Sequence, residues 1–117
     1  MNQNNTLLKK AIIVKSIPEQ DEIFNMVCNI AGLDPKVVRK NNRSRIRELV
    51  YARQISLTLM AYTLPLSLST IARYFNKDHA TVIHSIKTVK NLLETDKRYL
   101  DKWGHLFEGI QLKEYKQ

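Results

Sequence analysis

Glycine and proline are scarce in this chain, and their positions constrain its fold more than any other feature. The 117 residues contain three glycines and three prolines, and all six lie between segments in which apolar residues recur at helical spacing. Since glycine and proline interrupt regular structure, segments of this length and period indicate an all-α protein. A chain of this size has room for one domain with one modest core. We therefore expect a small helical bundle.

Capping residues and apolar periodicity predict the helices of this bundle. The first follows Pro18 and ends just before Gly32, which supplies a left-handed stop. Its expected core face consists of Ile23, Val27, Ile30 and Ala31. Asp34 and Pro35 begin a short second helix. Further helical segments are expected over about residues 46–63, 68–75, 78–95 and 99–110, the last packing back on the body. Residues 1–16 fit either a short strand or a helical turn.

Two of these segments, 68–75 and 78–95, follow each other across a tight break. A short helix, a turn of about three residues and a longer helix form the helix-turn-helix arrangement. Ser67 is expected to cap the shorter helix, and Asp78 or Asn76 is expected to cap the longer one. The expected core face of the longer helix consists of Val82, Ile86, Val89 and Leu93.

The opposite face of the longer helix is small and mostly uncharged near its N-terminus. At about 100° per residue, this face carries Ala80, Thr81, His84, Lys87, Thr88 and Asn91. An ordinary solvent face would be rich in charged pairs, whereas this one can press into a DNA major groove and meet base edges. Asp78 is either a cap alone or also an acceptor for a cytosine amino group. His79 and His84 are core or rim residues, and their spacing makes a poor metal site.

Positive charge is concentrated in the middle of the chain. Residues 36–90 contain eleven Lys or Arg and two acids, whereas the rest of the chain contains eight basic and nine acidic residues. A solvated surface would mix the signs, so the excess indicates a polyanionic partner. Duplex DNA presents one charge per ~1.7 Å of its axis. RNA and acidic lipid fit the same excess.

Arg53 lies within the apolar arc of the predicted helix 46–63. This arc contains Ile46, Leu49, Val50, Leu57 and Met60. A lone buried charge is costly, so the guanidinium must reach a carboxylate, with Asp78 as a candidate, or a DNA phosphate. The alternative is a structural arginine whose charged end extends to the rim of the core.

Several classes of protein are not indicated by the sequence. Cys28 is the single cysteine, so we expect neither a disulfide nor a cysteine-based zinc site, and its apolar neighbours predict a buried thiol. No carboxylate pair, nucleophile–base pair or metal cluster indicates an enzyme, a metal or another cofactor. The chain does not start with a signal peptide, and no apolar run approaches ~20 residues. A cytoplasmic protein without a membrane partner is therefore expected.

Three stretches resemble the C-terminal DNA-binding domain of the bacterial replication initiator DnaA. They read RIRELVYARQ at 45–54, SLSTIARYF at 67–75 and DHATVIHSI at 78–86, and the resemblance extends over about residues 18–96. It implies an all-α, TrpR-like bundle built around a helix-turn-helix. We accordingly divide the chain into an N-terminal extension (1–17), the DNA-binding domain (18–96) and a C-terminal helical extension (97–117) that packs on it.

The resemblance also assigns DNA contacts to particular residues. In the major groove these are Asp78, His79, Ala80 and Thr81. Arg45 is expected to enter the adjacent minor groove, flanked by Arg43 and Arg47. Arg53 is expected to contact a backbone phosphate. The further candidate DNA contacts are Gln54, Ser67, Lys77, His84 and Lys87.

This chain departs from the family pattern at three places. Ala80 stands where the family often has Ser or Thr, and Ser69-Thr70 stands where it usually has Pro-Glu. The glycine spacing from Gly104 to Gly109 matches a phosphate loop, but the required Lys-Ser/Thr is replaced. We expect no ATPase module and no bound nucleotide.

The resulting hypothesis is sequence-specific binding of double-stranded DNA at sites like the DnaA box, in a replication or transcription regulator without enzymatic activity. Binding is expected to be monomeric, with a homodimer left open. The alternatives are an RNA-binding domain and a helical protein-interaction module that docks through an exposed stripe of Trp103 and Phe107.

Overall fold

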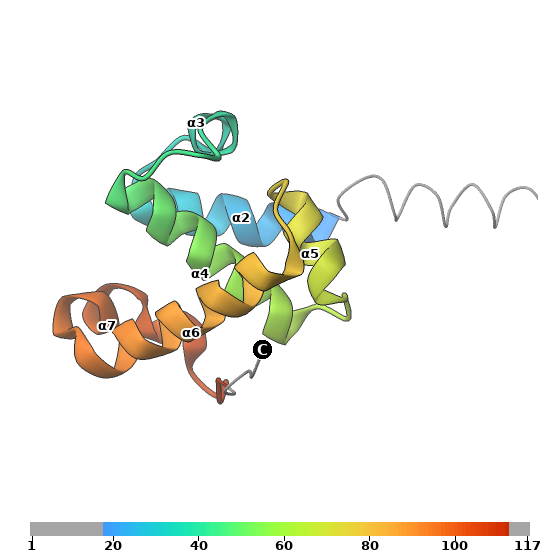
Figure 1. Ribbon diagram of the computed structural model, residues 1–117. Helices are drawn as coiled ribbons and strands as arrows, with labels where there is room; N and C mark the ends of the chain where they lie inside the picture. The colour runs from blue at the N-terminus through green and yellow to red at the C-terminus, as the bar shows by residue number, and fades with distance from the viewer. Residues whose placement is uncertain (1–17, 113–117) are drawn as a thin grey trace, which may run out of the picture.

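The computed structural model describes residues 18–112, and the predictions for residues 1–17 lie outside this range. The described residues form six α-helices and one short 3-10 helix, with no strand among them (Figure 1). In chain order they are α2 (Pro18–Ala31), α3 (Pro35–Lys40), α4 (Arg47–Thr63), α5 (Leu68–Tyr74), α6 (His79–Thr95), α7 (Lys97–Trp103) and η1 (Gly104–Phe107). The all-α fold predicted from the sequence is confirmed.

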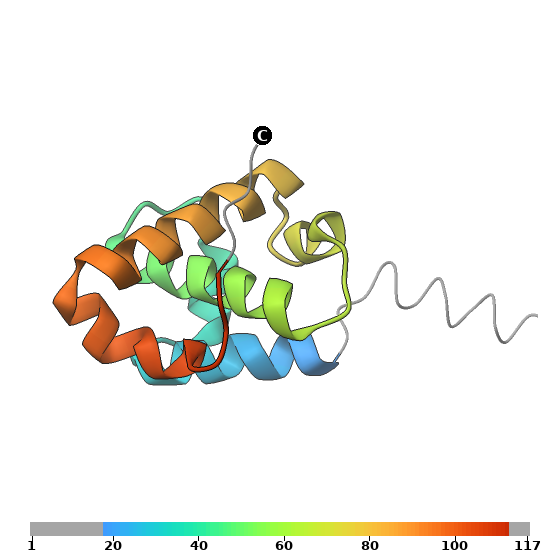
Figure 2. The same ribbon diagram turned by 90° about the horizontal axis from the view of Figure 1, so that it is seen from below.

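Helix α4 is the central element of the bundle. Figure 2 shows it between α6 on one side and α2 on the other, with α5 at one end and α7 at the other. This position explains why α4 is buried around most of its circumference from Ile55 to Met60. Ser56 and Thr58 lie inside this stretch, and each hydroxyl donates a hydrogen bond to the carbonyl oxygen four residues earlier, at 2.7 and 2.8 Å.

Local capping chemistry sets the helix boundaries close to the predicted ones. The side chains of Asp34, Ser67 and Asp78 each accept a hydrogen bond from a first-turn amide of the helix that follows. Gly32 has a φ of 72° just after α2, as a left-handed stop requires. Asn76, the other candidate cap for α6, instead adopts a φ of 57° within the preceding turn.

The core face of α2 differs from the predicted one. Phe24, Val27 and Cys28 are fully buried, whereas Ile23 and Ile30 are half-buried. The face is rotated because Phe24 packs edge to face against the rings of α5 and its C-cap, with a centroid distance of 5.3 Å to Phe75. The buried thiol is confirmed, and burial raises the pKa of Cys28 to about 11.

Helices α2, α3 and α5 are joined by a small polar and aromatic cluster. The hydroxyl of Tyr74 donates a 2.5 Å hydrogen bond to Asp21, and the guanidinium of Arg39 stacks 4.4 Å from the centroid of the Tyr74 ring. Burial, followed by the bond to Asp21, raises the pKa of Tyr74. The cluster therefore fixes α3, and the loop that follows it, relative to the helix-turn-helix.

The chain after α6 folds back onto the bundle. Tyr99, Trp103 and Phe107 are buried in the same core as α4 and α6. The alternative in which Trp103 and Phe107 form an exposed docking stripe is therefore wrong. Across residues 18–112, no helix has the length and apolar character needed to cross a membrane.

Candidate nucleic-acid interface

A basic loop of residues 41–46 connects α3 to α4. Arg43 and Arg45 within it, and Arg47 at the first position of α4, are all exposed. Within the loop, the amide of Ile46 donates a 3.2 Å hydrogen bond to the hydroxyl of Ser44. The three arginines predicted to approach the minor groove therefore project from one ordered segment.

Arg53 of helix α4 holds this loop in place through two hydrogen bonds. Its Nη1 donates to the carbonyl oxygen of Asn41 at 3.1 Å, and its Nη2 donates to that of Ser44 at 2.6 Å. Arg53 is 8% exposed, and burial lowers its pKa. The candidate pairing of Arg53 with Asp78 is wrong, because the guanidinium donates to these two loop carbonyls instead. Contact between Arg53 and a DNA phosphate stays a prediction.

A left-handed residue makes the turn of the helix-turn-helix tight. Phe75 ends α5, Asn76 takes the positive φ, and the amide of Lys77 then returns to the carbonyl oxygen of Ala72 at 2.9 Å. Asparagine adopts this conformation more readily than most residues. Lys77 thus lies directly before the N-terminus of α6, where a cation can reach a phosphate.

Asp78 organises the N-terminus of α6. Its Oδ1 accepts a 3.0 Å hydrogen bond from the amide of Thr81 and a 3.1 Å hydrogen bond from the hydroxyl of the same residue. These two bonds, the backbone one first, lower the pKa of Asp78. The carboxylate is therefore ionised at neutral pH and remains exposed to solvent.

The first turns of α6 present the side chains predicted to read bases. His79 and His84 are exposed, so their interpretation as core histidines is wrong, and Ala80 and Thr81 are half-buried. The opposite face is buried as predicted at Val82, Ile86 and Val89. Ile83 and Ser85 are also buried, because α4 and α5 both pack against α6 and widen its covered arc.

Two of the predicted contact residues are not freely available at the surface: Ser67 is hydrogen-bonded at the start of α5, and Gln54 is half-buried. The Ser67 hydroxyl accepts from the amide of Thr70 at 3.1 Å and pairs with its hydroxyl at 2.9 Å, so Ser67 forms the N-cap half of a capping box without the reciprocal bond that a glutamate would make. Gln54 is half-buried, and its Oε1 has no hydrogen-bond partner among the described residues. Lys87, in contrast, is exposed on α6.

The predicted position of Ile46 is wrong. It was expected on the apolar arc of α4, but the helix begins at Arg47, and Ile46 lies in the loop with 59% of its surface exposed. Helical periodicity cannot detect this, because Ile46 also continues the apolar pattern one residue before the helix. Its neighbours Arg45 and Arg47 are the one local signal that it belongs to the basic loop.

The basic loop and the turn before α6 both lie toward the upper side of the molecule in Figure 1, with α4 and α5 between them along the chain. A short helix, a tight turn and a longer helix with exposed first turns define a helix-turn-helix protein. A family model described as the bacterial dnaA protein helix-turn-helix matches residues 20–89. The chain belongs to this family.

Relatives of this chain share the name chromosomal replication initiator protein DnaA. The one from Bacteroides thetaiotaomicron is 42% identical over 80 residues, which are 68% of this chain and 17% of the relative. The one from Campylobacter jejuni subsp. doylei is 28% identical over 113 residues, which are 91% of this chain and 25% of the relative. The chain thus spans a minor part of the relatives that it matches. No solved structure matches it.

Proposed function

We propose that this protein binds double-stranded DNA sequence-specifically at sites like the DnaA box. The observation that carries the proposal is the start of α6, where exposed His79 stands beside half-buried Ala80 and Thr81 on a capped helix. Such a surface fits a major groove, in which hydroxyls and imidazoles meet base edges and methyl groups meet thymine methyls. The missing hydroxyl at Ala80 is expected to shift the preferred sequence away from that of relatives with Ser or Thr.

The remaining candidate residues divide by the kind of contact. Arg45 is proposed to enter the minor groove, where basic side chains respond to groove width. The proposed phosphate contacts are Arg43, Arg47, Arg53, Lys77 and Lys87, with Ser67, Gln54 and His84 at the margins of the interface. Asp78 is proposed to accept from a cytosine amino group through the side of its carboxylate that does not cap α6.

Duplex DNA is favoured over RNA by the shape of this surface. A helix that enters a groove with its first turns needs a wide major groove, and the major groove of A-form RNA is deep and narrow. Single-stranded RNA is recognised through exposed aromatic platforms, whereas α6 contains no Phe, Tyr or Trp and offers only the two imidazoles of His79 and His84.

We propose a regulatory or accessory role without enzymatic activity, nucleotide or metal. The relatives are named as replication initiators, and this chain corresponds to their helix-turn-helix part. A protein that occupies initiator sites through a helix-turn-helix of this kind would compete for the sites or mark them. The expected location is the nucleoid in the cytoplasm of a bacterial or phage-infected cell.

Selection of binding sites from random duplexes, followed by salt titration, tests this proposal. With about five to seven phosphate contacts, the slope of log K against log salt should lie near −4 to −6. RNA should compete poorly, and sedimentation on a single site should give one protein per site. A slope near zero contradicts DNA binding through phosphate contacts, and equal competition by RNA contradicts the preference for duplex DNA. A stable dimer on paired half-sites contradicts only the monomeric binding mode.

A further inference from the structure

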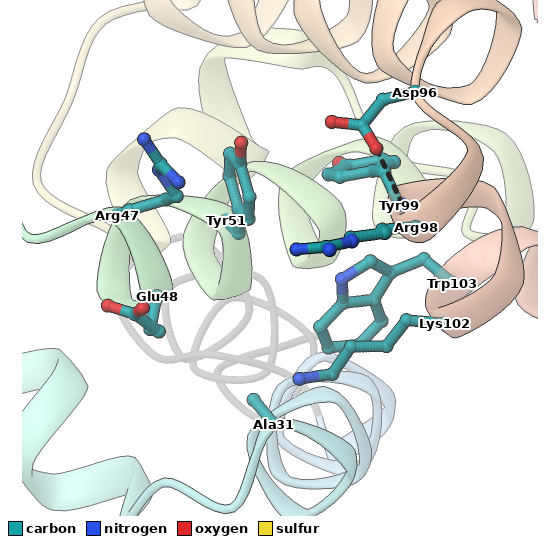
Figure 3. A pocket seen from close by; sticks show the side chains of 9 residues that line it. All are labelled: Ala31, Arg47, Glu48, Tyr51, Asp96, Arg98, Tyr99, Lys102 and Trp103. Carbon is teal, nitrogen blue, oxygen red and sulfur yellow. Dashed lines mark hydrogen bonds between the residues drawn. The ribbon is translucent and has the colours of Figure 1, made fainter.

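A pocket of about 220 Å³ lies between the end of α2, the start of α4 and helix α7. Tyr51, Tyr99 and Trp103 form its aromatic wall, and the rings of the two tyrosines meet edge to face with centroids 5.1 Å apart. Figure 3 shows these side chains around one space, with Arg98 extending across it from α7. Helix α7 follows residue 89, where the family match ends, so one side of this pocket lies outside the matched helix-turn-helix.

Positive charge exceeds negative charge around the pocket. Arg47, Arg98 and Lys102 line it together with two carboxylates, Glu48 and Asp96. Asp96 is engaged as the cap of α7. Among residues 18–112, none of the three cations forms an ion pair. Lys102 is engaged with the ring of Trp103, because its Nζ lies 5.3 Å from the ring centroid. Arg47 and Arg98 are therefore the pocket cations that have no partner among residues 18–112, and they lie beside an apolar aromatic surface.

The hydroxyl of Tyr99 is an unsatisfied polar group at this site. Tyr99 is 4% exposed, lines the pocket, and its hydroxyl has no hydrogen-bond partner within the described part of the chain. Buried hydroxyls nearly always have a partner. Burial raises the pKa of Tyr99, so the group keeps its proton. The hydroxyl oxygen is closed off from solvent, so Tyr99 contributes its ring to the pocket wall rather than a hydrogen bond to a ligand.

We propose that this pocket binds a small anion that carries one aromatic ring. Drug-sized ligands occupy pockets of roughly 300–1,000 Å³, and the smaller volume here limits the occupant to a single ring. The ring would pack against Tyr51 and Trp103, and the anionic group would bind the guanidinium of Arg98.

Arg47 connects this pocket to the basic loop. It lines the pocket and also directly follows the loop at the start of α4. A bound anion that attracts Arg47 would remove one cation from the DNA-binding surface. Binding of the anion should therefore lower the affinity for DNA, and binding of DNA should lower the affinity for the anion. This step rests on the proposed function, whereas binding to the pocket itself does not.

Phenyl phosphate is a suitable probe because Trp103 is the only tryptophan in the chain. Its indole N–H gives one isolated proton–nitrogen cross-peak, whose shift reports occupancy. Phenyl phosphate should move this peak saturably, whereas inorganic phosphate and benzyl alcohol, which supply the charge and the ring separately, should each bind about tenfold more weakly or worse. Equal affinity for inorganic phosphate and phenyl phosphate, or no saturable shift, overturns the proposal.

Variants of α7 separate ligand binding from folding. Arg98→Ala should weaken phenyl phosphate about tenfold. Lys97→Ala is the matched control, because Lys97 is outside the pocket and pairs with Asp101 at 3.2 Å. Tyr99→Phe keeps the ring contact with Tyr51 and removes only the buried hydroxyl, so it should leave both the fold and phenyl phosphate binding unchanged. Equal effects of Arg98→Ala and Lys97→Ala overturn the site. DNA binding measured on the same variants tests the proposed function separately.

Discussion

The Nη2 of Arg53 donates a 2.6 Å hydrogen bond to the carbonyl oxygen of Ser44, so the middle of helix α4 shapes the loop that precedes that helix. The same guanidinium bonds the carbonyl oxygen of Asn41 through Nη1. Its planar fork suits two acceptors at a fixed separation. The buried charge, expected from the sequence to meet a carboxylate or a DNA phosphate, is thus bound by two backbone carbonyls of the basic loop.

Replacing Arg53 with lysine should loosen the basic loop. A single ammonium cannot reproduce both bonds in one planar geometry, and the loss of hydrogen bonds to a charged group should cost roughly 1–3 kcal/mol of unfolding free energy. Urea unfolding and amide hydrogen exchange at Ser44 measure the two effects. Arg43→Lys is the control, since Arg43 is exposed in the same loop. Equal stability of the two variants would refute the structural role.

Ile46→Ala should weaken DNA binding without changing its salt dependence. Ile46 is 59% exposed between two arginines, and apolar side chains in a minor groove can pack against sugars or base steps. Truncation should cost about 1–2 kcal/mol of binding free energy, while the salt slope stays constant because no charge is removed. Met26→Ala, at a position 41% exposed on α2, should have no effect. A shallower slope for Ile46→Ala would instead indicate a displaced loop.

The Asp78 cap should make stability depend on acid pH. Hydrogen bonds from Thr81 hold the pKa of Asp78 below its ordinary value of 3.8. A depressed carboxyl pKa stabilises the folded state above the unfolded pKa, and this contribution is lost as pH falls through the folded value. Unfolding of wild type and Asp78→Asn by urea, from pH 7 to below 3, should show the difference between them narrowing below about pH 4. Parallel curves over the whole range would contradict the cap.

Local chemistry made most helix boundaries predictable from the sequence. The caps Asp34, Ser67 and Asp78 each bond an amide two or three residues away, so the information lies within one turn. The partners of Arg53 could not be predicted in the same way, because the carbonyl oxygens of Asn41 and Ser44 approach it only when the loop folds over α4. Every residue has a backbone carbonyl, so the sequence does not indicate which of them accepts a hydrogen bond from Arg53.

Which side chains of a helix are buried also depends on tertiary packing, and helical periodicity alone predicts this incompletely. Helical periodicity placed Ile46 on the apolar arc of α4, but the start of the helix at Arg47 leaves it in the loop. The exposure of His79 likewise depends on the tight turn at Asn76, which turns the first residues of α6 away from the core. The pocket beside Trp103 depends on where α7 folds back, which its own sequence does not specify.

The sharpest test of base recognition compares His79→Ala with Lys77→Ala. His79 is exposed at the first position of α6, so its loss should cost about 1–3 kcal/mol on the selected site and much less on random duplex. Lys77 lies in the turn, so its loss should weaken both kinds of DNA alike and lower the salt slope by about one. Fluorescence anisotropy on both duplexes at several salt concentrations measures these effects. Both variants should unfold like wild type, because neither side chain belongs to the core. Equal losses on selected and random DNA for His79→Ala would mean that α6 lies on the phosphate backbone without reading bases.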